Sequence, residues 1–343
     1  MLSGLSPVVL AIAGGFALGA AYGAIGQRSR FCLIAAVSNY ALIRDSRQLQ
    51  AWIAAFAVAL VAAQALDSAG MVALAESGYR RGGLDWLGAA AGGLVFGIGG
   101  ALAGGCAGRT VVNAAAGGAG PLAALAAFAL AAWATHFGFL EPLRVRLALA
   151  TSVPVGDLSA AALLGVPALG LAVALALAAA IAIAVLRPQP ALVAVGAAVG
   201  ALVAAGWWVT GLAAEESFGE LHPESLTFSG PLARAVALLL GQRLAAAAFG
   251  LALLGGTMLG AFAAAALSGD LRWTLPATGR WRYYVGGGAL MGVGATLAGG
   301  CNVGIGLTGS STLSVNAFLA AASIVIGIRL GLALLERTEP GAD

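Results

Sequence analysis

The sequence predicts an all-α polytopic membrane protein with about nine transmembrane helices, short re-entrant half-helices and an inverted internal repeat. Of its 343 residues, 61% are hydrophobic and 9% are charged, whereas a soluble domain carries roughly a quarter of charged residues. Apolar runs of ~20 residues, the length that a helix needs to cross hydrocarbon, recur along the whole chain. A glycine-rich stretch that ends on a cysteine occurs twice.

The two copies of this stretch are GLVFGIGGALAGGC, from Gly93 to Cys106, and GALMGVGATLAGGC, from Gly288 to Cys301. They agree at eight of fourteen positions, and both end on LAGGC. The chain has only three cysteines, and the third is Cys32. The match therefore predicts an internal duplication that places two thiols in equivalent positions.

Hydropathy predicts helices and half-helices in a definite order along the chain. Transmembrane helices are expected near 8–26, 51–72, 84–103, 120–140, 160–186, 191–213, 240–266, 284–299 and 316–335. Three apolar segments that begin at or next to a cysteine are too short to cross alone, namely 30–43, 106–117 and 301–314. We expect these short segments to be half-helices.

The chain is expected to form one transmembrane domain over residues 1–343. Its first repeat half is placed at 1–150, a connecting helix at 151–190 and the second half at 191–343. Because the repeated stretches fall in the third and the eighth crossing, they should run in opposite directions. Transporters use inverted-topology repeats of this kind to build a central site.

A second glycine match does not fit this scheme. Gly19 and Gly23 match Gly256 and Gly260 in spacing, but the crossing count makes their two helices parallel. Repeated Gly-x-x-x-Gly is typical of close helix packing. The match is therefore either coincidental or a sign that one crossing is miscounted.

Short arginine-rich loops predict the orientation in the membrane. Segments 44–50, 187–190 and 267–283 are assigned to the cytoplasm, which puts the N-terminus outside and the C-terminus inside. Loops 76–83 and 141–157 also carry arginines and fall outside, against the rule. The net charge of +3 does not indicate a nucleic-acid partner, and the lipid bilayer is the expected environment.

The two glycine–glycine–cysteine turns are the candidate site. Paired glycines permit an abrupt break with positive φ, and a broken backbone inside a bilayer is tolerated only where it is buried in protein or lines a cavity. The helix that follows would point its N-terminus at the thiol, which favours an anion. The candidate substrate-binding residues are Cys32, Cys106, Cys301, Gly104, Gly105, Gly108, Arg109, Gly299, Gly300, Asn302 and Thr308.

Less specific interpretations stay open for several of these residues. A buried cysteine is often a small hydrophobe, and Arg109 either counters an anion or caps a helix. Cys32 is either a third thiol of the site or the start of an interfacial helix behind Arg28 and Arg30. The cysteines show no C-x-x-C pair or zinc-like spacing, and the sequence indicates no metal and no cofactor.

The cysteine-bearing stretches GAIGQRSRFCL, LAGGCAGRT and LAGGCNVGIGLTG resemble the YeeE/YedE family of sulfur-compound transporters. The resemblance covers nearly the whole chain, and the family places a cysteine in each stretch, which matches Cys32, Cys106 and Cys301. It implies a multi-pass protein of the bacterial inner membrane that takes up thiosulfate. It also implies a small cytoplasmic sulfur-carrier protein as a partner, although some family members are linked to selenium or other sulfur species.

The resulting hypothesis is an importer of thiosulfate or a closely related sulfur oxyanion, and not an enzyme. Thiols would pass the ion along a central path by weak S–H hydrogen bonds, without covalent chemistry. A membrane thiol enzyme that forms a persulfide on Cys106 or Cys301 is an alternative. So are a transporter of another sulfur or selenium species and a neutral-solute channel in which the cysteines have no role.

Overall fold

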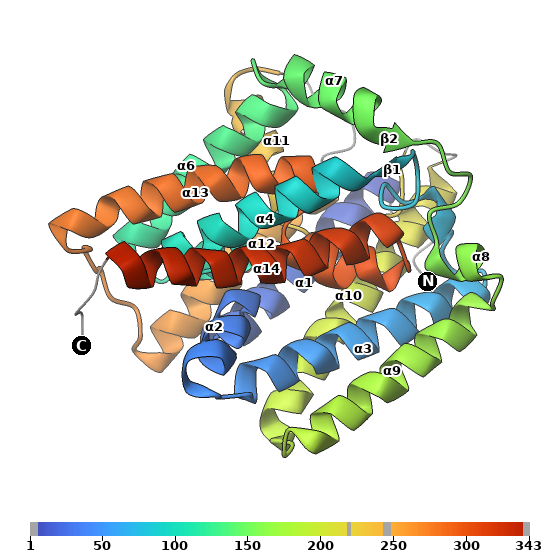
Figure 1. Ribbon diagram of the computed structural model, residues 1–343, viewed down its shortest axis with the longest axis horizontal. Helices are drawn as coiled ribbons and strands as arrows, with labels where there is room; N and C mark the ends of the chain where they lie inside the picture. Colours follow the sequence, from blue (N-terminus) through green and yellow to red (C-terminus); the bar gives the residue numbers. More distant parts are fainter. Residues whose placement is uncertain (1–5, 218–220, 243–247, 339–343) are drawn as a thin grey trace.

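The computed structural model describes residues 6–217, 221–242 and 248–338. Helices make up almost all of it, and most long helices run side by side across the view of Figure 1. The two-residue strands β1 (Leu84–Asp85) and β2 (Ser152–Val153) form one antiparallel pair. The long helices are α1 (Pro7–Ser29), α3 (Arg47–Ser68), α4 (Trp86–Ala103), α6 (Ala119–His136), α9 (Ala168–Val185), α10 (Pro190–Glu216), α12 (Ala248–Ser268), α13 (Trp281–Ala298) and α14 (Val315–Thr338).

Each predicted transmembrane segment contains one of these long helices, so the all-α polytopic class is confirmed. In the described residues, eight helical spans are long and apolar enough to cross a membrane. The ninth helix, α13, does not qualify, because its first turn carries Arg282 and two tyrosines and its middle is rich in glycine. It packs between α4 and α6 in the helix bundle. Residues 243–247 of the predicted helix at 240–266 lie outside the described residues.

The predicted helix at 160–186 is wrong as a single element. It consists of α8 (Ala160–Leu164) and α9, which are separated by a turn. Gly165 adopts φ +67° at the end of α8, and Pro167 follows, a residue that cannot continue a helix from the preceding turn. Hydropathy alone overlooked this break because the turn residues are themselves apolar or small.

Two helices lie where the sequence predicted loops. The segment 141–157 contains α7 (Glu141–Thr151), and the segment 214–233 contains the start of α11 (Ser229–Leu239). Exposed apolar side chains of α7 alternate with arginines, so it shows no continuous apolar stripe that would reveal a helix. Helix α11 is too short to cross the membrane. It follows a glutamate-rich stretch, so hydropathy did not predict it.

Glycines on α1 and α12 explain the second glycine match. A Cβ on Gly19 would collide with the carbonyl of Leu253, and one on Gly256 with the carbonyl of Phe16. Gly23 and Gly260 make the same kind of backbone approach. The two helices are parallel and lie face to face, so the crossing count is correct. The match reflects two surfaces that pack together rather than repeat-equivalent helices.

The same contact recurs between α10 and α3, where Gly196 approaches the carbonyl of Ala51 and Gly200 that of Ala55. Helices α1 and α10 thus make equivalent contacts, and so do α12 and α3. Helix α1 is the first crossing and α10 the sixth, so these two helices run in opposite directions through the membrane. The arrangement has the form of a two-fold relation between the two parts of the chain.

The repeated stretches make equivalent contacts as well. Gly97 of α4 packs against Ile324 of α14, and Gly292 of α13 packs against Phe128 of α6. At the centre α4 and α13 cross each other, with Gly99 against Gly287 and Gly92 against Gly294. Rising numbers on one helix meet falling numbers on the other, so α4 and α13 are antiparallel. This is the relation that the crossing count predicts.

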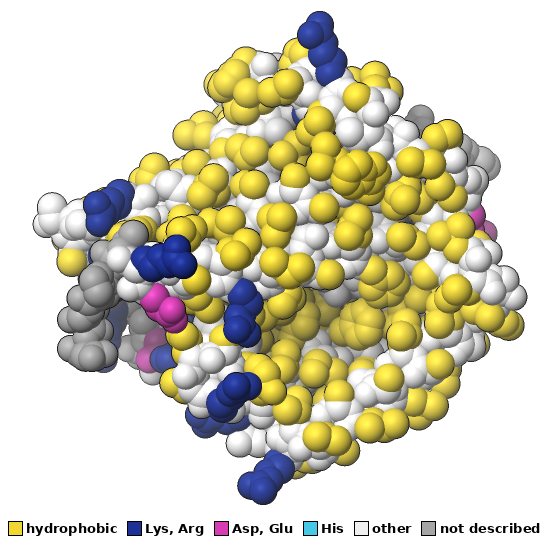
Figure 2. All heavy atoms as spheres, in the orientation of Figure 1, with side chains coloured by type: hydrophobic (Ala, Val, Ile, Leu, Met, Phe, Trp, Pro, Cys, Tyr) yellow, Lys and Arg dark blue, Asp and Glu magenta, His cyan; other side chains and the backbone are white. Residues whose placement is uncertain are grey.

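The helix ends divide the molecule into two faces. At one face, α1, α9, α12 and α14 end while α3, α10 and α13 begin. We call it the arginine face, because it carries Arg28, Arg30, Arg44, Arg47, Arg187, Arg272, Arg280, Arg282 and Arg337. Figure 2 shows dark blue side chains at the left, where α13 begins and α14 ends in Figure 1, and in the lower part of the view, with one more at the top and yellow side chains over much of the remaining surface.

Two neighbouring glycines of α12 provide a test of the close packing. Gly256→Ala should lower the free energy of unfolding by about 1–3 kcal/mol, since a backbone carbonyl cannot move aside for the new methyl group. Gly255→Ala is the matched control, because nothing lies within 4 Å of a Cβ at that position. Thermal unfolding of the purified variants in detergent measures the effect. Equal melting temperatures for the two variants would contradict the packing described here.

Candidate functional site

Each of the three cysteines lies at the start of a short helical segment. Cys32 is the N-cap of α2 (Leu33–Ile43), and Cys106 is the N-cap of α5 (Ala107–Ala115). Cys301 directly precedes the helical residues that lead into η3, a π-helical segment (Gly304–Gly309). All three thiols are free, and none of the three residues is more than 3% exposed.

The sulfur atoms receive backbone N–H groups from these helices. The N–H of Arg109 donates to the sulfur of Cys106, and the N–H of Gly304 lies 3.5 Å from Sγ of Cys301. Cys32 is contacted in the same way by the first residues of α2. The first N–H groups of a helix lack partners inside the helix and carry partial positive charge. The predicted geometry, a helix N-terminus aimed at each thiol, is present.

Glycines make the two breaks possible. Gly104 has φ +72° and Gly299 has φ +82°, a conformation that costs a residue with a side chain roughly 1–2 kcal/mol. The N–H of Gly105 then bonds the carbonyl of Gly100 at 3.1 Å, and that of Gly300 the carbonyl of Ala295 at 2.8 Å. These bonds satisfy carbonyls that the helix ends would leave free in the bilayer.

The thiols meet in one buried cluster. Cys32, Cys106 and Cys301 belong to a single set of touching core residues. Tyr22 belongs to the same cluster, and its ring lies 5.1 Å from that of Phe228. The cysteines therefore face neither lipid nor separate packing layers.

A cavity of about 590 Å³ opens at the arginine face, and Arg109, three residues after Cys106, lines it. We call it the Arg109 cavity. Arg109 donates to the carbonyl of Gly26 at 2.9 Å, which orients its guanidinium at the cavity wall. The lining residues with polar or charged side chains are Gln27, Arg28, Arg30, Arg109, Asn113, Asp270, Arg272, Thr274 and Tyr284. Four arginines against one aspartate make this cavity electropositive.

A second cavity of about 420 Å³ opens at the other face, and we call it the Arg234 cavity. It reaches Gly299, Thr227 and Ser229, which lie next to the second cysteine turn. The hydroxyl oxygen of Ser229 accepts the backbone N–H of Cys301 at 3.1 Å. This cavity therefore ends one hydrogen bond away from the Cys301 backbone.

The two cavities lie on opposite faces of the helix bundle. Ala11, near the start of α1, lines the Arg234 cavity, and Gln27, near its end, lines the Arg109 cavity. Sixteen residues of helix separate them, about 24 Å at the helical rise. Helix α6 likewise contributes Pro121 near its start to one cavity and His136 at its end to the other. The thiol cluster lies between the two.

Three further predicted site residues, Gly108, Thr308 and Asn302, differ in their contacts. A Cβ on Gly108 would meet the Tyr22 hydroxyl and the Phe228 ring, so only glycine fits beside them. The Thr308 hydroxyl donates to the carbonyl of Leu226 at 2.7 Å and holds that segment in place. Asn302 is fully buried, and neither atom of its amide has a hydrogen-bond partner. A buried amide without partners normally costs about 1–3 kcal/mol.

Sequence reasoning missed the residues of the Arg234 cavity. Thr227 lies just before α11, and Ser229 and Arg234 lie in it, between the predicted helices at 191–213 and 240–266. No spacing in the sequence relates them to Cys301. Two ionisable residues near helix ends, Asp67 and His136, differ in their surroundings. Asp67 accepts the N–H of Leu74 at 2.9 Å, while His136 lines the Arg234 cavity.

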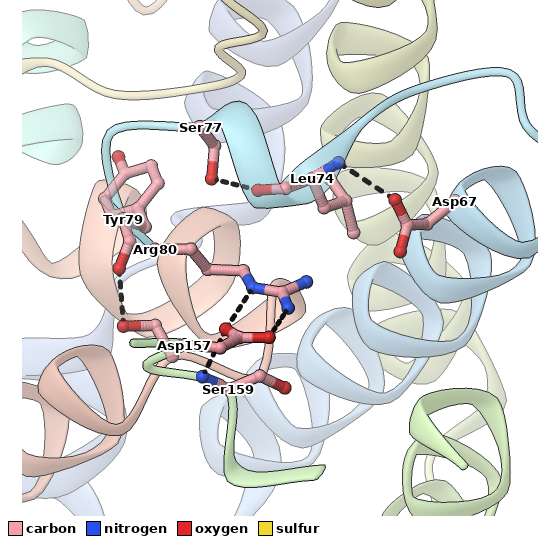
Figure 3. A network of polar contacts seen from close by, with 8 residues as sticks. Asp67, Leu74, Ser77, Tyr79, Arg80, Asp157 and Ser159 are labelled. Carbon is pink, nitrogen blue, oxygen red and sulfur yellow. Dashed lines mark hydrogen bonds and ion pairs between the residues drawn. The ribbon is translucent and has the colours of Figure 1, made fainter. Parts of the chain in front are cut away.

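Polar contacts fix the segment that carries Tyr79, another residue of the Arg234 cavity wall (Figure 3). Arg80 binds both carboxylate oxygens of Asp157, at 3.1 and 2.5 Å. The hydroxyl of Ser314 donates to the Tyr79 carbonyl at 2.7 Å, and Ser77 closes its turn onto Leu74. The figure shows the Tyr79 ring pointing away from the ion pair, so the ion pair anchors the backbone while the ring stays at the cavity.

Fold and site together define a multi-pass membrane protein with a buried thiol cluster between two cavities on opposite faces. The family model described as Sulphur transport matches residues 28–330. The chain belongs to this family of sulfur-compound transporters, as the resemblance of its three cysteine stretches implied.

Two curated relatives span almost the full length of the chain. One is named thiosulfate transporter TsuA of Escherichia coli (strain K12), 27% identical over 337 residues that cover 92% of each chain. The other carries the same name in Spirochaeta thermophila and is 28% identical over 331 residues, 91% of this chain and 96% of the relative. Both names are those of transporters, and this favours transport over the enzymatic alternative.

The Arg80–Asp157 pair gives a prediction on pH and stability. Arg80 holds the pKa of the Asp157 carboxyl below its usual range. A carboxyl with a depressed pKa stabilises the fold above its unfolded pKa of about 3.9, and the gain is lost as pH falls through the folded value. Asp157→Asn should therefore lower the melting temperature at neutral pH, with the difference shrinking in strong acid.

Asp45→Asn is the matched control for this measurement. Asp45 pairs with its neighbour Arg47 at 2.7 Å, but that arginine is 59% exposed and the pair connects no distant segments. Exposed pairs of this kind contribute little to stability. If Asp157→Asn were as stable as Asp45→Asn at neutral pH, the ion pair would not anchor the Tyr79 segment.

Proposed function

We propose that the chain imports thiosulfate, or a closely related sulfur oxyanion, through the thiol cluster between its two cavities. The observation that carries this proposal is the position of all three cysteines, each at a helix N-terminus, in one buried cluster with a cavity on either side. The family membership and the names of two relatives support the same substrate class.

The chemistry of the site suits a soft divalent anion. Thiosulfate carries two negative charges and a terminal sulfur that accepts hydrogen bonds. A neutral thiol is a weak donor with little hydration of its own, while a thiolate would repel the anion. Helix N-termini beside Cys106 and Cys301, together with Arg109, offset part of the cost of dehydrating the ion. Weak donors in series allow binding without trapping, so no bond needs to form or break.

The two-fold pattern of helix contacts supports inverted repeat halves at 1–150 and 191–343, with 151–190 as the connection. In transporters such halves provide access to a central site from each side in turn. The thiols are closed off from both cavities here, which corresponds to an occluded arrangement. Movement of one half against the other would open one cavity to the cluster at a time.

The arginine face supports a direction of transport. Basic residues in short loops favour the cytoplasmic side, so the Arg109 cavity opens inward and the Arg234 cavity outward. The protein then lies in the bacterial inner membrane and delivers the ion at an arginine-lined mouth. A small cytoplasmic sulfur-carrier protein would receive the cargo there.

Uptake of labelled thiosulfate into reconstituted vesicles tests the thiol relay. Cys106→Ala and Cys301→Ala should each reduce the initial rate by about five- to tenfold, since each removes a donor worth about 1–1.5 kcal/mol to the passing ion. The serine variants should keep partial activity, because a hydroxyl still donates a hydrogen bond. Unchanged uptake in both alanine variants would rule out the relay.

Mass spectrometry of the wild-type protein after turnover separates the relay from covalent chemistry. The three cysteine-containing peptides should have the masses of their unmodified forms. A persulfide or other sulfur adduct on Cys106 or Cys301 would favour the thiol enzyme instead. Selenium oxyanions offered in competition with thiosulfate determine how narrow the substrate range is.

The amide of Asn302 gives an independent prediction. Because the amide has no partner, Asn302→Leu should leave the melting temperature unchanged or raise it, yet reduce uptake at least about fivefold if the amide binds the ion. The control is Gln64→Leu, which removes a buried hydrogen bond of 2.7 Å to the Ser311 carbonyl and should destabilise the fold. Full uptake by Asn302→Leu would remove the amide from the path.

A further inference from the structure

The Arg234 cavity contains an acid where an anion path should have none. Glu224 lies in the segment between α10 and α11 and lines the cavity beside Arg234. Its Oε2 is 3.7 Å from Nη1 of Arg234, beyond the 2.7–3.2 Å of an N–H···O hydrogen bond. The same Nη1 is buried without a hydrogen-bond partner. An ionised Glu224 would both neutralise Arg234 and repel an incoming dianion.

The surroundings of Glu224 make its charge easy to remove. Burial raises the pKa of its carboxyl, and the opposing effect of Arg234 is too small to cancel that rise. The side chain is still 27% exposed, so a proton can reach it from the cavity. Tyr79, His136 and His222 line the same cavity.

Other charged groups near this cavity lie close to its two histidines. Arg81 contacts the ring of His222 at 3.1 Å, and Arg144 and Glu141 of α7 act on His136. Within the described part of the chain, the charged group that acts on Glu224 is Arg234. The two histidines are therefore the competing explanation for any pH dependence, and the experiment must separate them from Glu224.

Hydrogen bonds connect Glu224 to the Cys301 turn. Its N–H donates to Oγ1 of Thr210 at 3.1 Å, and that hydroxyl in turn donates to the Glu224 carbonyl. Two residues later, the Leu226 carbonyl accepts from Thr308 in the segment that follows Cys301. The backbone of Glu224 is thus fixed on both sides, and a change at its carboxyl is confined to the side chain and Arg234.

We propose that Glu224 is a proton-controlled latch that occupies Arg234 when ionised and releases it to a divalent oxyanion when protonated. The inference rests on the proposed function, since it concerns capture of the same anion. The proton comes from the solution on the cavity side. It returns there when the anion leaves Arg234 toward Cys301 and the carboxylate pairs with the guanidinium again. No other bond changes.

Titration calorimetry of thiosulfate binding to the full-length protein in detergent tests the latch. Run from acid to neutral pH in buffers of different ionisation enthalpy, it measures both Kd and the protons taken up. The wild type should bind more weakly as pH rises, by about tenfold per pH unit where one proton is linked. Glu224→Gln should bind with the affinity that the wild type shows at low pH, at every pH, and take up no proton.

Glu216→Gln is the matched control, because this exposed glutamate ends α10 at the same face and its variant should keep the wild-type profile. If Glu224→Gln kept the wild-type pH dependence and His136→Asn or His222→Asn abolished it, the histidines would be responsible and the latch overturned. A flat wild-type profile would overturn it as well. Absence of thiosulfate binding and uptake at every pH would instead count against the proposed function.

Discussion

Hydrocarbon offers no hydrogen bonds, so a helix broken inside the membrane must find partners for its freed backbone groups within the protein. The rest of this structure depends on how two breaks meet that requirement. At Gly104 and Gly299 the backbone turns with positive φ, and the next N–H closes onto the helix it leaves. The N–H groups of the following segments then face Cys106 and Cys301. Once the hydrogen bonds of the two breaks are formed, backbone N–H groups remain that point at the two thiols.

Close packing of glycine faces surrounds these breaks with protein. Helices α4 and α13 cross through glycines at the centre, and α1 and α10 rest on α12 and α3 through others. Small residues are what allow helices in lipid to approach so closely. Because the helices lie so near to one another, three cysteines from distant parts of the chain share one cluster with Tyr22 and Phe228.

Charge is distributed unequally along the resulting path. Cations line both cavities, whereas the three thiols between them lie in a cluster of buried aliphatic and aromatic side chains. The cation comes from a different place in each half: Arg109 lies three residues after Cys106, whereas Gly304 stands at that position after Cys301. Thr227 and Tyr79 leave no room there for a side chain, and Arg234 of α11 provides the charge instead. Charged donors thus lie in the two cavities, and the weakly donating thiols lie between them.

The sequence by itself determined the class of fold, the order of the long helices and the two cysteine turns, because hydropathy and glycine pairs are local properties that the bilayer forces on a chain. It could not reveal the break between α8 and α9, the helix α11 or the cavity residues Arg234 and Glu224, whose neighbours are distant in the chain. It also left two meanings for the match of Gly19 with Gly256. Only tertiary packing decided these points, since which surfaces meet depends on every helix together and on no single spacing.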